Sequence, residues 1–277
     1  MTSSLLCPNC RKLISADESR CPYCGISFPG SRWRNNFLTR ILGRTDVMIR
    51  TIIFINAGMY LLTVLFNSAP PGVSMNPLTY LSPDNTSLML LGATGTFPID
   101  KLHRWWTILS ANYLHGGILH ILFNMFAFWQ LSPLVAREYG NYRTFIIYTL
   151  GGASGFIVSY LAGVTFTIGA SAAICSLIGA ILYYGKSRGG VYGQIIYKQV
   201  GAWALSIFIF GFLVRGINNW GHGGGMLAGM LLGVLLGYRE KKAETSVHRA
   251  LAVACVVVSA ATLIWAFFSG IYYRIPR

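Results

Sequence analysis

Seven long apolar stretches constrain this chain more than any other feature of its sequence. Hydrophobic residues make up 54% of its 277 residues and charged residues only 11%. A soluble fold of this size has too little interior to hide so much apolar surface. Apolar runs of roughly 20 residues match the length of a helix that crosses a bilayer core of about 30 Å. The sequence therefore predicts an all-α, polytopic membrane helix bundle. The seven stretches cover approximately residues 48–67, 113–134, 144–163, 168–184, 199–214, 217–238 and 250–273.

The Lys and Arg residues fall unequally on the two sides of such a bundle. If the N-terminus is cytoplasmic, 17 of the 22 lie on the cytoplasmic side and five lie outside. Membrane proteins retain basic residues on the cytoplasmic side. We therefore expect a multi-pass protein of a bacterial inner (plasma) membrane, with its N-terminus in the cytoplasm and its C-terminus outside. This topology signal explains most of the formal net charge of +14, so nucleic acid is a poor candidate partner.

Four of the six cysteines lie before the first apolar stretch. Cys7-Pro-Asn-Cys10 and Cys21-Pro-Tyr-Cys24 are two CxxC pairs separated by ten residues. Two such pairs offer four thiolates for the tetrahedral site that zinc prefers. The alternative, a pair of disulfides, is disfavoured in a reducing cytosol. We expect residues 1–30 to form a small zinc-ribbon-like module, with structural Zn²⁺ and a structural or partner-docking role. A basic linker, 31–46, follows it.

Polar residues inside the apolar stretches point to a functional site. All eight carboxylates lie outside these stretches, whereas ionisable groups at membrane depth are costly and usually functional. His120 and Asn124 are four residues apart, on one face of the second predicted helix. Ser171 and His222 are expected near the outer ends of the fourth and sixth. The polar residues within the stretches are His115, His120, Asn124, Gln130, Asn218, Asn219 and His222.

Small residues predict how the fourth and sixth helices meet. A glycine recurs at every fourth position from Gly221 to Gly237, and the fourth helix offers a matching small-residue face around Ser171, Cys175 and Gly179. In lipid, such faces let helix backbones approach closely. Both faces have an alternative interpretation as packing surfaces with incidental polar groups. If they meet, however, Ser171 and His222 lie at one depth.

This combination suits nucleophilic acyl transfer. A serine hydroxyl is a weak nucleophile until a neighbouring imidazole removes its proton. Asn124, His120 and the backbone N–H of Ser171 are candidate donors to the developing oxyanion. With no buried carboxylate, we expect a Ser–His dyad. Gly152-Ala153-Ser154-Gly155 also looks like a nucleophile motif, but no histidine is expected at its depth, so we interpret it as helix packing.

Three segments together resemble the rhomboid family of intramembrane serine proteases. HGGILHILFN (115–124), GASAAICSLIGA (169–180) and GHGGGMLAG (221–229) are similar to the family's HxxxxHxxxN, GxSx and AHxxGxxxG patterns, with Gly221 in place of the alanine. The resemblance implies a six-helix core at 47–238 with a water-filled site open to the outside, which cuts membrane-anchored substrates near or within their transmembrane segments. It implies Ser171 as nucleophile, His222 as base, and His120 with Asn124 as oxyanion partners. His115 is a neighbouring polar residue.

The remaining residues, 239–277, are expected to form a cytoplasmic loop and a seventh transmembrane helix. The chain departs from the family pattern at three positions, where Ala172, Cys175 and Thr107 replace a glycine, an aromatic residue and an arginine. The main alternative is a catalytically silent rhomboid-like protein that binds transmembrane clients. Two further alternatives are a transporter with a histidine proton relay, which would lack buried carboxylates, and a histidine metal site, in which Ser171 would have no role.

Overall fold

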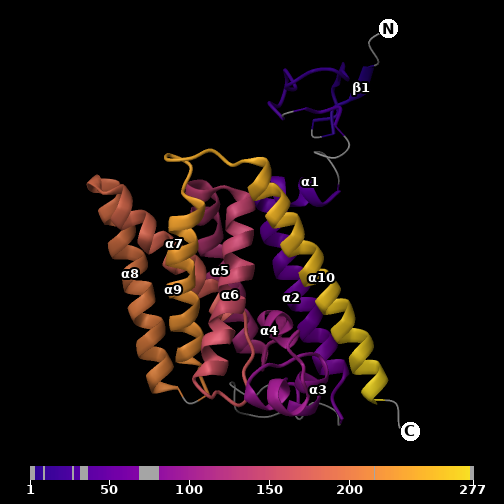
Figure 1. The fold of residues 1–277 in the computed structure, drawn as a ribbon, viewed down its shortest axis with the longest axis vertical. Coiled ribbons are helices and arrows are strands. Elements are labelled where there is room, and N and C mark those ends of the chain that lie inside the picture. The colour runs from indigo at the N-terminus through magenta and orange to yellow at the C-terminus, as the bar shows by residue number, and fades with distance from the viewer. Residues whose placement is uncertain are drawn as a thin grey trace.

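The computed structural model describes residues 4–8, 10–26, 28–31, 37–68, 81–214 and 216–274, and it is a helix bundle with a small N-terminal module (Figure 1). The module contains one antiparallel pair of strands, in which Leu5 pairs with Ile14. The bundle consists of long helices joined by short connections and one longer loop between α2 and α5. The strands are β1 (Ser4–Leu6) and β2 (Leu13–Ser15), and the α-helices are α1 (Phe37–Gly43), α2 (Thr45–Leu65), α3 (Asn85–Leu90), α4 (Thr107–Ser110), α5 (Ile118–Tyr139), α6 (Asn141–Leu161), α7 (Ser171–Arg188), α8 (Gly190–Leu213), α9 (Asn219–Leu236) and α10 (Ser246–Arg274).

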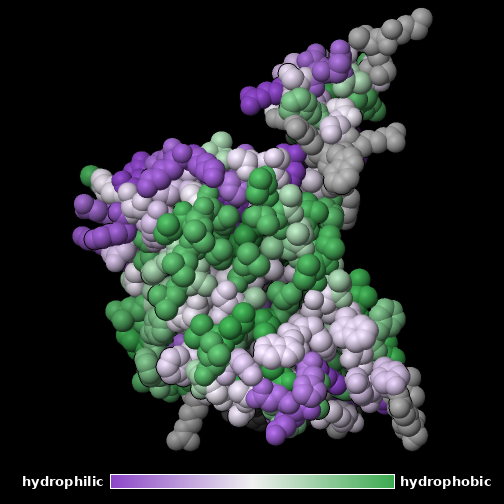
Figure 2. All heavy atoms as spheres, viewed as in Figure 1, coloured by the Kyte–Doolittle hydropathy of each residue, from purple (hydrophilic) through white to green (hydrophobic). Residues whose placement is uncertain are grey.

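Within the described residues, five helices are long and apolar enough to cross a membrane: α2, α5, α6, α8 and α10. They expose large apolar side chains, and the molecule carries an apolar band between two hydrophilic ends (Figure 2). The chain is therefore an integral membrane protein. The sequence predicts seven spans; the other two, α7 and α9, have 18 residues each but fall below the apolarity of the five. The cause is their composition, since α7 ends in Lys186 and Arg188 and α9 is rich in glycine.

The bounds of two predicted spans need correction. The second helix begins at Ile118 rather than near residue 113, because residues 111–113 form a separate 3₁₀ turn and Gly117 has an extended backbone that starts α5. His115 therefore precedes the helix. The fifth span is longer than predicted: α8 begins at Gly190, and Gly189 and Gly190, which both have a positive φ, form the turn from α7.

The N-terminus and the C-terminus lie at opposite ends of the molecule (Figure 1). The end with the α9–α10 connection is held together by the fully buried Arg143. Its guanidinium donates to the carbonyl oxygens of Lys242 at 2.8 Å and Ala243 at 2.7 Å. These bonds hold the α9–α10 connection against the first turn of α6.

Small residues bring α6, α7 and α9 into backbone contact at the centre of the bundle. A Cβ atom on Gly225 or Gly229 would overlap the carbonyl oxygen of Ala172 or Ser176. Because this pairing advances by four residues on both helices, α7 and α9 run parallel and side by side, as the small-residue faces predict. Their N-terminal ends, which carry Ser171 and His222, therefore lie at the same end of the bundle.

The long loop between α2 and α5 packs closely against the bundle over its described part, residues 81–117. Leu91, Ala93 and Ile99 are completely or almost completely buried. Thr94 pairs with Thr167 through two backbone hydrogen bonds of 3.0 and 2.7 Å. The loop thereby supports the segment that leads into α7. Pro70, Pro71 and Pro77, which precede this part of the loop in the sequence, lie outside the described residues.

Candidate active site

Ser171 is the first residue of α7 and is half-buried. Two residues before it, Gly169 has a φ of +123°, and its N–H donates to the carbonyl oxygen of Ala111 at 2.9 Å. Glycine suits this position for two reasons: the backbone is left-handed, and a Cβ would lie 2.9 Å from Nε2 of His120. The same point lies 3.6 Å from Oγ of Ser171. The tight turn therefore brings the hydroxyl and the His120 ring to one place.

His120 lies in the first turn of α5, and one hydrogen bond determines how its ring is used. The N–H of Gly116 donates to Nδ1 of His120 at 3.2 Å. Because Nδ1 accepts, the neutral ring carries its proton on Nε2. Nε2 is the His120 atom that lies nearest to the Cβ position of Gly169. His120 therefore has a hydrogen-bond donor on the side of its ring where Ser171 lies.

Asn124 and His115 flank His120. The Asn124 side-chain amide donates to the carbonyl oxygen of His120 at 2.9 Å, which leaves its second N–H for another acceptor. His115 is completely buried, and its ring stands edge-on to that of His120 with centroids 5.1 Å apart. Neither ring nitrogen of His115 has a hydrogen-bond partner among the described residues. The structure thus confirms His115 as a polar neighbour of His120.

His222 lies in the first turn of α9 and is 7% exposed. Among the described residues, no hydrogen bond joins His222 to Ser171, and Nδ1 of His222 is buried without a partner. The residues next to Ser171 and His222 do lie close together, on either side of Gly155. A Cβ on Gly155 would lie 2.6 Å from the carbonyl oxygen of Gly221 and 3.0 Å from Cβ of Ala172.

Asn218 fixes the start of α9 relative to its surroundings. Its carboxamide oxygen accepts the N–H of Gly221 at 2.9 Å, which caps the helix. Its NH₂ group donates to Oγ of Ser159 on α6 at 2.7 Å and to Oγ1 of Thr167 at 2.9 Å. Thr167 is four residues before Ser171, so one side chain connects the helix of His222 with the segment that leads to Ser171.

The start of α7 also supplies free backbone donors. The first N–H bonded within the helix region is that of Ile174, which donates to the Ala170 carbonyl oxygen at 2.9 Å. The N–H groups of Ser171, Ala172 and Ala173 precede it and have no intrahelical acceptor. Together with the positive end of the helix dipole, they favour a negative charge beside Ser171.

The comparisons with known proteins agree with this arrangement. Residues 102–239 match the family model described as the Rhomboid domain, a range that contains His120, Ser171 and His222. Residues 102–239 therefore form a rhomboid-family domain. The chain is similar to the "Rhomboid protease GluP" of Bacillus subtilis (strain 168), with 36% identity over 45% of this chain and 24% of that protein. It is also similar to two Arabidopsis thaliana proteins, "RHOMBOID-like protein 4" (30% identity, 54% of this chain and 38% of the relative) and "RHOMBOID-like protein 6, mitochondrial" (26%, 64% and 64%).

The match to these rhomboid relatives is confined to part of each protein. The chain covers between about a quarter and two fifths of the length of the first three curated relatives. The rhomboid match leaves out the cysteine module, α2 and α10.

The three departures from the rhomboid pattern have identifiable surroundings. The Ala172 methyl group packs against the backbone of Gly155. Cys175 is buried in the main apolar core. Thr107 donates to Oγ1 of Thr94 at 3.0 Å, so it supports the loop residue that pairs with Thr167. None of the three removes a candidate reacting group.

The second serine motif of the sequence, Gly152-Ala153-Ser154-Gly155, lies within α6. Oγ of Ser154 donates to the carbonyl oxygen of Leu150 in its own helix at 2.8 Å. Its neighbours Gly152 and Gly155 contact Asn112 and Gly221 instead. The motif therefore brings α6 against the active-site helices.

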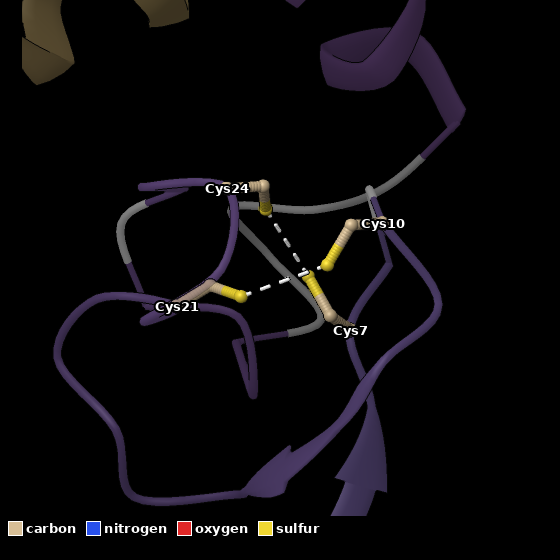
Figure 3. A group of neighbouring side chains, drawn as sticks. All are labelled: Cys7, Cys10, Cys21 and Cys24. Atoms are coloured by element: carbon tan, nitrogen blue, oxygen red, sulfur yellow. Dashed lines mark hydrogen bonds between the residues drawn. The ribbon is translucent and has the colours of Figure 1, made fainter.

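The four N-terminal cysteines form a second candidate site, whose sulfur atoms point toward one another (Figure 3). All four Sγ atoms lie within 4.8 Å of one another, with Cys7–Cys24 at 3.6 Å and Cys10–Cys21 at 3.7 Å. These separations exclude disulfides, whose S–S bond is about 2.05 Å. They fit a tetrahedral Zn²⁺ site, in which Zn–S bonds of about 2.3 Å place the sulfur atoms about 3.8 Å apart.

The two CxxC pairs fold into equivalent turns. Arg11 N–H donates to the Cys7 carbonyl oxygen, and Gly25 N–H donates to that of Cys21, both at 2.9 Å. Arg11 and Gly25 also share a positive φ, of 59° and 72°. Equivalent turns direct two sulfur atoms each toward one point, as a Cys₄ metal site requires.

Proposed function

We propose that this rhomboid-family chain is an intramembrane serine endopeptidase that hydrolyses membrane-anchored proteins near the outer face of the bilayer. The observation that carries the proposal is the convergence of Ser171, His120 and His222 at the parallel N-terminal ends of α7 and α9 and the start of α5. Their sequence patterns belong to a family whose members include a named protease.

The reaction follows from the chemistry of these groups. Oγ of Ser171 attacks the carbonyl carbon of the scissile bond and gives its proton to the neutral imidazole of His222. The C–N bond then breaks, and the imidazolium returns this proton to the leaving amine. Water then attacks the acyl carbon and gives its proton to His222. The C–O bond of the acyl-enzyme breaks, and the imidazolium returns this proton to Oγ of Ser171. The imidazolium has no carboxylate partner within α7 or α9, which makes the machinery a dyad.

The oxyanion would be stabilised by three kinds of donor. We assign this role to Nε2–H of His120, which lies beside the Ser171 turn, to the free amide N–H of Asn124 one helical turn further along α5, and to the backbone N–H groups at the start of α7. Preorganised donors of this type contribute most when water is excluded, and removal of one costs about 10²–10³ in rate. A Ser171–His222 hydrogen bond is absent among the described residues, so the proposal requires it to form when the substrate binds.

The proposal includes a topology. We place the N-terminus and the α9–α10 connection in the cytoplasm of a bacterium, because 17 of 22 Lys and Arg residues fall on that side. All seven long helices, α7 and α9 included, then cross the inner membrane, and Ser171 lies toward the outer face. The cysteine module lies in the cytoplasm, where structural Zn²⁺ would stabilise it for docking to a partner.

The experiment that tests the activity uses purified full-length protein in liposomes and a single-span model substrate. We expect cleavage near the outer end of the substrate helix. Ser171→Ala and His222→Ala should abolish cleavage, while the free energy of unfolding and the gel-filtration profile stay unchanged. Ser154→Ala is the matched control and should retain full activity.

The second candidate function is client binding without catalysis. The missing Ser171–His222 hydrogen bond and the unpartnered Nδ1 of His222 favour it. In that case the wild-type protein would bind the model substrate without cleaving it, and Ser171→Ala would bind it equally well. Cleavage by the wild type, with no cleavage by Ser171→Ala, would exclude this function.

A further inference from the structure

An apolar cleft lies on the α10 side of the bundle, between α1, α2, α6 and α10. Its volume is about 100 Å³. Ile55 and Ala260 at its edges are exposed, so the cleft opens between two helices, α2 and α10, that are apolar enough to cross a membrane. Residues from all four helices form its wall, including Leu42, Ile52, Phe145, Val256, Ala260 and Leu263.

Arg249 lies at the α1 end of this cleft. It precedes Val256 by seven residues, which places it on the same face of α10 and about 10 Å along the helix axis. Its guanidinium group lies over the ring of Tyr142, 5.5 Å from the centroid. The Tyr142 hydroxyl in turn lies 3.8 Å from the Cβ position of Gly43, the last residue of α1.

The charge of Arg249 has no acidic partner in the described part of the chain. Its Nε atom is buried without a hydrogen-bond acceptor. The acids at this end are already engaged: Asp46 pairs with Arg44 at 3.1 Å, and Glu244 accepts the N–H of Arg143 at 3.1 Å. A buried N–H donor without an acceptor is unfavourable, so the Nε–H group of Arg249 favours an anionic ligand.

We propose that the cleft binds one acyl chain of an anionic phospholipid and that Arg249 binds its phosphate. The apolar wall matches the hydrocarbon chain, and the guanidinium group matches the planar, two-point recognition of a phosphate. Basic pockets between transmembrane helices are recognised sites for anionic head groups. The bound lipid would connect α1 with α10, on the opposite side of α6 from the Ser171 turn.

The test uses full-length protein in detergent, incubated with phosphatidylglycerol or with phosphatidylcholine of identical acyl chains, and native mass spectrometry of the complexes. Arg249→Gln removes the charge at the cleft. Lys241→Gln is its control, because Lys241 lies at the same end but donates to Ser187 on α7. Ala260→Trp fills the cleft, and Ala261→Trp is the control on the adjacent, lipid-facing position.

We expect the wild type to retain about one phosphatidylglycerol per chain, at least fivefold more than phosphatidylcholine. Arg249→Gln should reduce this preference to near unity, and Ala260→Trp should reduce retention of both lipids at least fivefold. Both controls should behave as the wild type. Equal retention of the two lipids by the wild type, or unchanged retention in either cleft variant, would overturn the proposal. Protease activity plays no part in these readouts.

Discussion

Gly155 offers a direct test of how closely the active-site helices must pack. It lies on α6 where the backbone of Gly221 and the methyl group of Ala172 meet, each adjacent to one residue of the proposed dyad. The methyl group of Gly155→Ala would lie 2.6 Å from the Gly221 carbonyl oxygen and 3.0 Å from the Ala172 Cβ. Ordinary contact begins near 3.4 Å, so the helices would have to separate by roughly 0.8 Å.

A shift of this size should affect catalysis more than folding. Overpacking typically costs about 1–3 kcal/mol of stability, whereas a misplacement of about 1 Å in an active site can reduce the rate about 10²-fold. We therefore expect Gly155→Ala to lower kcat/KM for the model substrate by about 10- to 100-fold and to remain folded. The assay compares cleavage in liposomes with the thermal unfolding midpoint.

The control is Gly223→Ala on α9, which makes the same chemical change in open space. Its added methyl group would approach Phe208 no closer than 3.8 Å. This variant should retain wild-type activity to within about twofold, since it overlaps nothing and gains helix propensity. If Gly155→Ala were as active as Gly223→Ala, close packing at this point would not position the dyad.

Three further predictions concern the residues around this centre and the cysteine module. Asn218→Ala should lower kcat at least tenfold, whereas Asn218→Asp, which keeps the helix cap but loses the amide donors, should recover part of the activity. Equal kcat values for the wild type and both variants would refute a positioning role. Gly169→Ala forces a side chain into a left-handed backbone beside His120, so fluorophosphonate labelling should fall more than tenfold, and unchanged labelling would contradict the geometry of the turn. Cys7→Ser should reduce bound zinc from about one ion per chain to near zero by elemental analysis, while the unfolding midpoint of the helix bundle stays the same; a wild-type protein without zinc would refute the metal assignment.

The small-residue pattern explains why much of the bundle could be predicted from the sequence. A glycine at every fourth position of α9 has few uses other than close helix packing, and α7 carries the matching face. The two CxxC pairs predicted the cysteine cluster for a similar reason, because few structures other than a metal site need two such pairs near each other. In both cases local spacing determines the contact.

The contacts that support the site were harder to predict, because they join residues far apart in the sequence. Asn218 stood out as a buried amide, but its partners Ser159 and Thr167 are 59 and 51 residues away. The pairing of Thr94 with Thr167 depends on a loop whose fold no periodic pattern indicates. The only local signal was the position of Asn218 just before α9, where Asn commonly caps a helix.

The start of α5 was misplaced for a physical reason. Residues 113–117 contain no Lys, Arg or acidic residue that would end the hydrophobic run, yet Gly116 and Gly117 let the chain turn before the helix begins. This turn is what allows the Gly116 N–H to bond the His120 ring. Hydropathy alone does not report such a break, since it measures polarity and not backbone freedom.

The measurement that tests the central claim most directly is the site of covalent modification by a fluorophosphonate probe, determined by peptide mass spectrometry on the purified protein in liposomes. A Ser171 hydroxyl activated by His222 should carry the adduct, and the adduct should disappear in His222→Ala while Ser154 stays unmodified. Unmodified Ser171 in the wild type, or equal modification with and without His222, would contradict the proposed dyad.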